Sequence, residues 1–180
     1  MKLLAIESSG LVASAAVFAD DTIVAEFTVN NKQTHSQTLL PMIDQVVTMS
    51  GIDLKEIDAI ATTSGPGSFT GLRIGAATAK GLGLALHKPI VPITTLEALA
   101  FRLAGREGNI CPMMDARRNQ VYAGVYRVGD MLLECVTGQK AVSIEDYIAE
   151  LNDLGDPVTV LGDGVPVHRE ACLLYTSPSP

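Results

Sequence analysis

The chain has 180 residues, of which 47% are hydrophobic and 18% charged, a composition typical of a globular protein with a sizeable core. Its net charge of −7 argues against independent binding to nucleic acid, which needs a basic face. No apolar run reaches the ~18 residues of a membrane span, and the N-terminal run is too short for a signal peptide. The three cysteines are odd in number and lack metal-ligand spacing. We therefore expect a soluble cytoplasmic protein with reduced thiols.

Three apolar runs at the N-terminal end predict a meander of antiparallel strands. They cover residues 2–9, 13–18 and 22–29, with tight turns between them. Glu7 lies near the end of the first run. Its carboxylate could hold a metal or a water near a phosphate, or it could accept hydrogen bonds from the turn that the next two serines form. Position alone leaves both alternatives open.

A helix and a buried strand are expected next. Thr34 and Gln37 fit a capping box, apolar residues then recur at helical spacing, and Gly51 ends the helix. The apolar run at 58–63 predicts a strand that leads into the glycine-rich segment at 64–86, SGPGSFTGLRIGAATAKGLGLAL.

The glycine-rich segment predicts a turn followed by a long helix. Gly65 and Gly67 belong to the turn, and Ser68 or Thr70 can cap the helix. Free N–H groups and the helix dipole at this position can hold a phosphate. No Gly-Lys-Ser/Thr follows, so the loop is not a Walker A motif. The alternative is a tight strand-to-helix turn with a close packing contact.

The glycine helix predicts contacts on two sides. Each glycine in its interior costs roughly 1 kcal/mol relative to alanine, so we expect another element to pack close to its backbone. The helix is apolar around most of its circumference, which indicates burial on more than one face. One face should cover the sheet and the other should bind a partner, together with the preceding helix. The residues assigned to this partner surface are Leu39, Leu40, Ile43, Val46, Val47, Leu72, Gly75, Ala76, Ala79, Leu82 and Gly83.

The rest of the chain predicts further strands and helices. Strands are expected at 89–94, 111–114, 121–126, 131–136 and 158–161, and helices at 95–103 and 143–151. The β-α-β-α order before residue 105 implies parallel strands added to the meander. We expect an N-terminal half at 1–105 and the start of a related half at 106–172. The Ser/Pro-rich end does not fit this pattern, so residues 173–180 are interpreted as a non-native tail.

Few other residues suggest a site. None of His35, His87 and His168 has a second histidine at the spacing of a helical metal pair. The charged turn at 115–119 carries an aspartate and two adjacent arginines. This turn could clasp an anion or a partner, or be a solvated hairpin tip, and loops often carry recognition.

Four segments resemble one family. IESS, DAIATTSGPGSFTGLRIGAATAKGLGLALHKPI, DARRNQVYAGVY and LGDGV are similar to the TsaB (YeaZ) family of bacterial tRNA threonylcarbamoyladenosine synthesis. The resemblance covers residues 1–170. It implies an α/β fold of the actin/Hsp70/sugar-kinase-like (RNase H-like) type. In such a fold a mixed sheet combines an antiparallel meander with parallel βαβ strands, and the second, related half is partial here.

The segment after the glycine helix distinguishes this chain from the catalytic paralogue, TsaD. The paralogue carries His-Leu-Glu-Gly-His there, and its two histidines bind the metal. Here the aligned positions include Thr95 and Leu99, which cannot replace an imidazole at a metal. The resemblance therefore implies a non-catalytic scaffold subunit. In that interpretation Glu7, Gly65, Gly67 and Ser68 are relics of the phosphate loop of an ATPase ancestor.

The resemblance also implies partners. It implies no cofactor and no metal on this chain, with ATP or ADP and the metal on partner subunits. The partners would be a TsaD-type paralogue, a TsaE-type ATPase, a second copy when the chain is alone, and tRNA only through the complex. Two other functions are considered. One is an active enzyme of the same fold, either a nucleotide-dependent transferase or kinase or a metalloprotease-like enzyme. The other is a structural homodimer with no link to tRNA.

Overall fold

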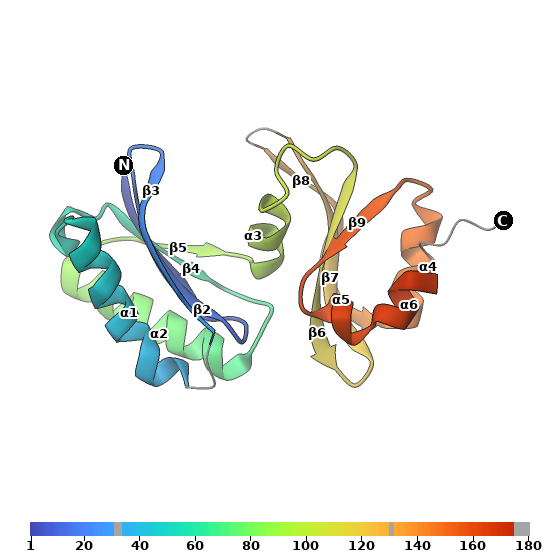
Figure 1. Cartoon of the computed structure of the whole chain (residues 1–180), viewed down its shortest axis with the longest axis horizontal. Coiled ribbons are helices and arrows are strands. Elements are labelled where there is room, and N and C mark those ends of the chain that lie inside the picture. The colour runs from blue at the N-terminus through green and yellow to red at the C-terminus, as the bar shows by residue number, and fades with distance from the viewer. Residues whose placement is uncertain (31–33, 130–131, 175–180) are drawn as a thin grey trace. The chain divides into compact units, whose positions relative to one another are not determined.

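The computed structural model describes residues 1–30, 34–129 and 132–174. It divides into two compact units, Met1–Thr95 and the chain from Leu96 onward, and both appear in Figure 1. The division falls before the boundary expected at residue 105. The reason is helix α3 (Thr95–Phe101), whose buried Leu96 and Ala100 pack in the core of the second unit.

The first unit contains a five-stranded mixed sheet. Its strands are β1 (Lys2–Glu7), β2 (Ala13–Ala19), β3 (Thr22–Val29), β4 (Ala59–Thr63) and β5 (Ile90–Ile93). They lie in the order β3-β2-β1-β4-β5. The first three pair antiparallel, whereas β4 pairs parallel with β1 and β5 parallel with β4. This arrangement confirms the predicted meander with added parallel strands.

Two helices cover one face of this sheet, α1 (His35–Ser50) and α2 (Phe69–Leu86), and a short 3-10 turn, η1 (Leu54–Glu56), leads into β4 (Figure 1). Apolar side chains from both helices and the sheet form one core. Its buried members are Leu4, Ile6, Ala13, Ala15, Val17, Leu39, Met42, Ile43, Val46, Ile57, Ile60 and Ala79. The core is aliphatic, because no aromatic side chain is among these members.

The ends of α1 agree only in part with the sequence signals. Gly51 adopts a left-handed conformation, φ 67°, and ends the helix as expected. Thr34 occupies the N-cap position, but its side chain makes no capping hydrogen bond. Its hydroxyl lies 3.1 Å from that of Ser36, and its backbone carbonyl accepts from Gln37 N–H at 2.9 Å. The predicted capping box is therefore wrong.

The second unit repeats the first four strands. They are β6 (Asn109–Arg117), β7 (Gln120–Val128), β8 (Leu133–Ser143) and β9 (Val158–Leu161). Their order, β8-β7-β6-β9, and their directions match those of β3-β2-β1-β4. The repetition confirms the predicted fold class, a mixed sheet built twice. The predicted start of β8 at Met131 lies outside the described residues.

Helices cover both faces of the second sheet. Helix α4 (Ile144–Asp153) begins as predicted at Ser143, whose hydroxyl accepts from Asp146 N–H at 3.1 Å. Helices α5 (Gly164–Val167) and α6 (Arg169–Leu174) follow β9, and α3 contributes to a separate core on the opposite face (Figure 1). Most of the predicted tail, residues 175–180, lies outside the described residues. Within the described chain, no helix is long and apolar enough to cross a membrane.

Candidate functional site

The predicted phosphate loop lies against the turn that follows β1. Gly67 has φ 154°, and a Cβ there would lie 2.5 Å from the Ser9 carbonyl oxygen. Ser68 N–H donates to the same carbonyl at 2.6 Å, and the Ser68 hydroxyl accepts from Gly71 N–H at 3.2 Å as the N-cap of α2. Two N–H groups at the start of the helix are thus hydrogen bonded within the chain, and neither is free for a phosphate.

Glu7 stabilises the same turn. Its Oε1 accepts from Ser9 N–H at 2.5 Å and from the Thr63 hydroxyl at 3.4 Å. His35, whose Nε2 lies 2.8 Å from the Gly10 carbonyl oxygen, contacts the turn from α1. Two roles were considered for Glu7: holding a metal or water, and accepting hydrogen bonds from the turn. The observed hydrogen bonds are those of the second role.

Small residues on α2 allow it to approach the sheet closely. Gly71, Gly75, Ala79 and Gly83 recur every four residues and are all buried. A Cβ at Gly71 would clash with the Ser8 carbonyl oxygen, and one at Gly75 would clash with the Ser8 hydroxyl. This row therefore faces the sheet and the turn after β1, which settles which side of the helix is internal.

The residues assigned to a partner surface differ in exposure. Six are buried within the first unit: Leu39, Ile43, Val46, Gly75, Ala79 and Gly83. Four are half-buried: Val47, Leu72, Ala76 and Leu82. Leu40 is 56% exposed. Three large apolar residues on the same helices were not assigned to the surface, although Met49 is 75%, Phe69 73% and Leu84 78% exposed. The helical period alone could not separate the internal and external faces of α2, because both are apolar.

The two positions that the resemblance pairs with metal-binding histidines lie on α3. Thr95 is buried, and its N–H donates to the Gly65 carbonyl at 2.8 Å. Leu99 is half-buried against the second unit's core. Neither side chain is a metal ligand. Over residues 1–30, 34–129 and 132–174, no group of three His, Cys, Asp or Glu residues is arranged to hold a metal.

The charged turn connects β6 to β7. Arg117, Arg118 and Asn119 all adopt left-handed φ angles, 64°, 52° and 60°. The carboxylate of Asp115 accepts from Arg117 N–H at 2.8 Å, and the Asn119 amide donates to Glu145 at 2.6 Å. Both arginine side chains are exposed. The structure therefore places an ordered pair of cations at a hairpin tip.

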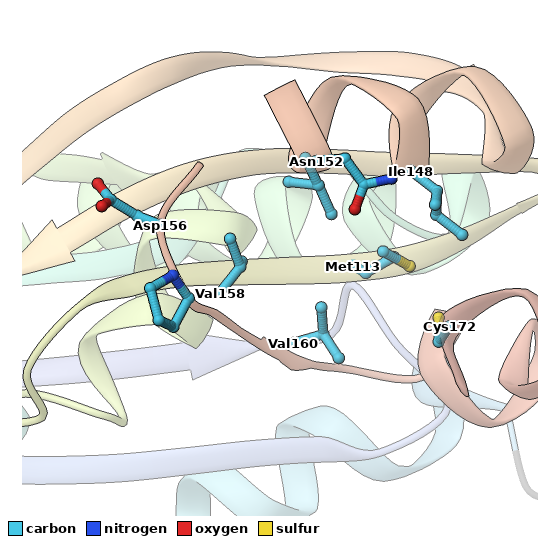
Figure 2. A pocket seen from close by; sticks show the side chains of 9 residues that line it. Met113, Ile148, Asn152, Asp156, Val158, Val160 and Cys172 are labelled. Atoms are coloured by element: carbon cyan, nitrogen blue, oxygen red, sulfur yellow. The ribbon is translucent and has the colours of Figure 1, made fainter. Parts of the chain in front are cut away.

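A cavity of about 310 Å³ lies elsewhere in the second unit. Figure 2 shows Ile148 and Asn152 from α4, Val158 and Val160 from β9, and Cys172 from α6 around it. Burial raises the pKa of the Cys172 thiol, which favours its neutral form. None of the residues predicted for a site lines this cavity, and its lining is mainly apolar.

The sheet that is built twice with the same strand order and directions is that of the actin/Hsp70/sugar-kinase-like class. The model of one family, "TsaD: tRNA N6-adenosine threonylcarbamoyltransferase", matches residues 22–170. A solved structure of YeaZ from Pseudomonas aeruginosa is similar, with a TM-score of 0.72 and 29% identity over 81% of this chain and 70% of that one.

Two curated relatives extend this result. The TsaB protein of Bacillus subtilis, named for tRNA threonylcarbamoyladenosine biosynthesis, is 34% identical over 94% of this chain and 74% of its own length. The TsaB protein of Escherichia coli is 36% identical over 71% of this chain. The match spans about half, 55%, of that relative. The chain belongs to the TsaB family, whose catalytic paralogue is TsaD.

Proposed function

We propose that this chain is a non-catalytic subunit that binds and supports a TsaD-type threonylcarbamoyltransferase during modification of tRNA adenosine 37. The observation that carries this proposal is that α3 has Thr95 and Leu99, and no histidine, at the two positions that the resemblance pairs with the metal-binding histidines of the paralogue. The names of the TsaB relatives support a role in tRNA threonylcarbamoyladenosine synthesis. In this proposal the chain acts in the cytoplasm, carries no cofactor of its own, and meets tRNA and a TsaE-type ATPase only through the complex.

The outer faces of α1 and α2 form the proposed partner surface. Leu84 is exposed on α2, and Leu40 and Met49 are exposed on opposite sides of the buried face of α1. Arg73 and Lys80 lie on the exposed side of α2. Exposed apolar side chains with charged neighbours are typical of an interaction surface. The same surface would serve a homodimer when the catalytic subunit is absent, and the two assemblies would then compete.

The alternative of an active nucleotide-dependent enzyme is less well supported. In P-loop and related sites the phosphates bind free N–H groups at a helix N-terminus. Here the Ser9 carbonyl accepts from Ser68 N–H, and the Ser68 hydroxyl accepts from Gly71 N–H. A nucleotide would have to displace the turn after β1 to reach these groups. A metalloprotease-like activity would lack the histidine pair on α3.

Co-purification tests the proposal. The tagged chain is co-expressed with the TsaD-type paralogue from the same source, and the complex is analysed by size-exclusion chromatography. We expect a stable complex for the wild type and for a control with Val167→Glu, since Val167 is 60% exposed in the second unit. Leu84→Glu should abolish the complex because it places a charge in the apolar contact.

Activity is measured on the same preparations. The catalytic subunit should modify tRNA faster with the wild-type chain than with the Leu84→Glu variant, and the chain alone should be inactive. A wild-type chain that does not bind the paralogue, or that transfers the threonylcarbamoyl group by itself, would refute the proposal. If Leu84→Glu still binds while Val167→Glu does not, the scaffold role survives but the helical surface is wrong.

A further inference from the structure

The hairpin tip between β6 and β7 is held in one conformation by three anchors. Arg117 N–H donates to the Asp115 carboxylate at 2.8 Å, which closes the start of the turn. The Asn119 carbonyl accepts from Ile144 N–H at 3.1 Å, and its amide donates to Glu145 at 2.6 Å. The tip is therefore attached to the first turn of α4 as well as to its own strand.

Its backbone is unfavourable without these anchors. Three consecutive residues with a Cβ lie in the left-handed region, which disfavours side chains other than glycine. Such a conformation persists where surrounding contacts fix it, and it often occurs at sites of recognition. The consequence is that the backbone carrying the two arginines is fixed before binding, so less backbone freedom is lost when they bind.

The tip is also a local concentration of hydrogen-bond donors. The four residues 117–120, Arg-Arg-Asn-Gln, are all exposed and polar. Among the described residues, no ion pair includes Arg117 or Arg118. The two carboxylates that anchor the tip contact other groups. Asp115 accepts from Arg117 N–H and lies 3.8 Å from His168 Nε2, and Glu145 accepts from the Asn119 amide.

We infer that Arg117 and Arg118 contact the phosphodiester backbone of RNA. A guanidinium group binds a phosphate through two parallel hydrogen bonds, and phosphate oxygens are acceptors only. Arginine is also enriched at protein interfaces, but there it accompanies aromatic and methionine side chains, and residues 117–120 include neither. The identity of the RNA as a tRNA rests on the proposed function. The contact itself does not depend on catalysis.

The contact would be local and weak in the isolated chain. A net charge of −7 opposes the approach of any polyanion, so we expect the two arginines to hold RNA weakly in the isolated chain and more tightly beside other contacts, such as those of a partner subunit. The contact positions the RNA and reads no base, because phosphates carry no sequence information.

The test compares two pairs of arginines in the same unit. A fluorescein-labelled, unmodified tRNA transcript is titrated with the wild type, with Arg117→Ala plus Arg118→Ala, and with Arg102→Ala plus Arg106→Ala. The second pair is the matched control, since both of its arginines are also exposed and the change in net charge is equal. Each protein is measured from 50 to 200 mM salt, alone and in complex with the paralogue, and thermal melting checks its folding.

We call Arg117→Ala plus Arg118→Ala the tip variant. It should weaken tRNA binding about tenfold and reduce the slope of log K against log salt by roughly 1 to 2, as for the loss of two phosphate contacts. Replacement of both arginines by lysine should restore most of the slope. The control pair should leave the slope unchanged. Equal losses of tRNA affinity in the tip variant and the control pair would indicate general charge attraction and would overturn the inference. A slope that stays unchanged in the tip variant would also overturn it.

Two further outcomes separate this inference from the proposed function. If the tip variant no longer binds the paralogue but still binds RNA as the wild type does, the tip is a protein contact and the inference is refuted. If the wild type forms no complex, the scaffold proposal is refuted, while the slopes measured on the chain alone still decide whether the tip binds RNA.

Discussion

The hydroxyl of Ser8 donates to the backbone carbonyl of Gly71 at 2.9 Å, and this hydrogen bond joins the end of β1 to the first turns of α2. Ser8 is 1% exposed, so the hydrogen bond is shielded from water. It forms because Gly71 and Gly75 have no side chains to separate the helix from the turn. The close contact between strand and helix therefore depends on two glycines.

The first prediction concerns Gly71→Ala and Gly81→Ala on the same helix. A Cβ at Gly71 would meet the Ser8 carbonyl oxygen, whereas one at Gly81 would meet open space. Gly71→Ala should lower the free energy of unfolding by about 1–3 kcal/mol through overpacking. Gly81→Ala should raise it by up to about 1 kcal/mol through helix propensity. Urea titration measures both, and changes of the same sign would contradict the packing described here.

The second prediction compares Ala79→Arg with Thr78→Arg. Ala79 is 0% exposed in the core of the first unit, so an arginine there buries an unpaired charge. We expect the first unit to lose about 3 kcal/mol or more of stability, or to unfold. Thr78 is half-buried beside the outer face, and an arginine there can extend into solvent. That variant should stay folded but lose the partner.

Circular dichroism and size-exclusion chromatography distinguish these outcomes. If Ala79→Arg is as stable as the wild type, the row of small residues does not face the sheet. If Thr78→Arg is folded and still binds the TsaD-type subunit, the outer face of α2 is not the interface.

The third prediction tests two N-caps. The Ser143 hydroxyl accepts from Asp146 N–H, whereas the Thr34 side chain makes no capping hydrogen bond. Ser143→Ala should therefore cost about 1 kcal/mol of stability, and Thr34→Ala only a few tenths. Denaturant unfolding of the two variants, followed by helical circular dichroism, gives the comparison. A larger loss for Thr34→Ala would show that the predicted capping box forms in solution.

The fourth prediction concerns alkaline pH. Burial raises the pKa of the Cys111 thiol from 9.0 to about 12, and burial also raises the pKa of the Tyr147 hydroxyl. The native state holds these protons more tightly than the unfolded chain. Their contribution to stability is therefore complete below about pH 9 and is lost as the pH rises toward 12. For Cys111 the loss is at most about 1.4 kcal/mol for each pH unit in that range.

Urea unfolding at pH 8, 9.5 and 10.5, monitored in the second unit, measures this loss. Cys111→Ala should reduce the fall in stability with pH. Cys135→Ser is the matched control, because Cys135 is exposed. A variant at Cys111 with the same pH dependence as the wild type would show that the buried thiol does not contribute.

Apolar runs and periodicity predicted nearly every element of the first unit, and β1, β2 and α1 each bury one regular apolar face. It could not say which face of α2 lies against the sheet, since apolar residues surround most of the helix. The glycines contain that information. The row formed by Gly71, Gly75 and Gly83 lies where the backbone touches other atoms, and Gly81, outside this row, meets none.

Other features of the structure depend on contacts that a sequence pattern does not describe. The strand β8 extends to Ser143 through a polar, mostly exposed stretch that has no alternation to detect. The three left-handed residues at 117–119 are stabilised by Asp115 and by α4, which lies 25 residues further along the chain. Thr34 had the residue type of a cap, but its hydroxyl bonds to Ser36 instead.

The acceptor opposite Ser68 N–H is a main-chain carbonyl, that of Ser9, and this limits how the first unit can evolve. A side-chain acceptor would disappear with one substitution, but every amino acid at position 9 keeps the same carbonyl. The Ser68 N–H therefore becomes free only if the turn after β1 changes its length or path. Glu7 holds that path as well, because its carboxylate accepts from Ser9 N–H. No substitution at position 9 alone can remove this acceptor.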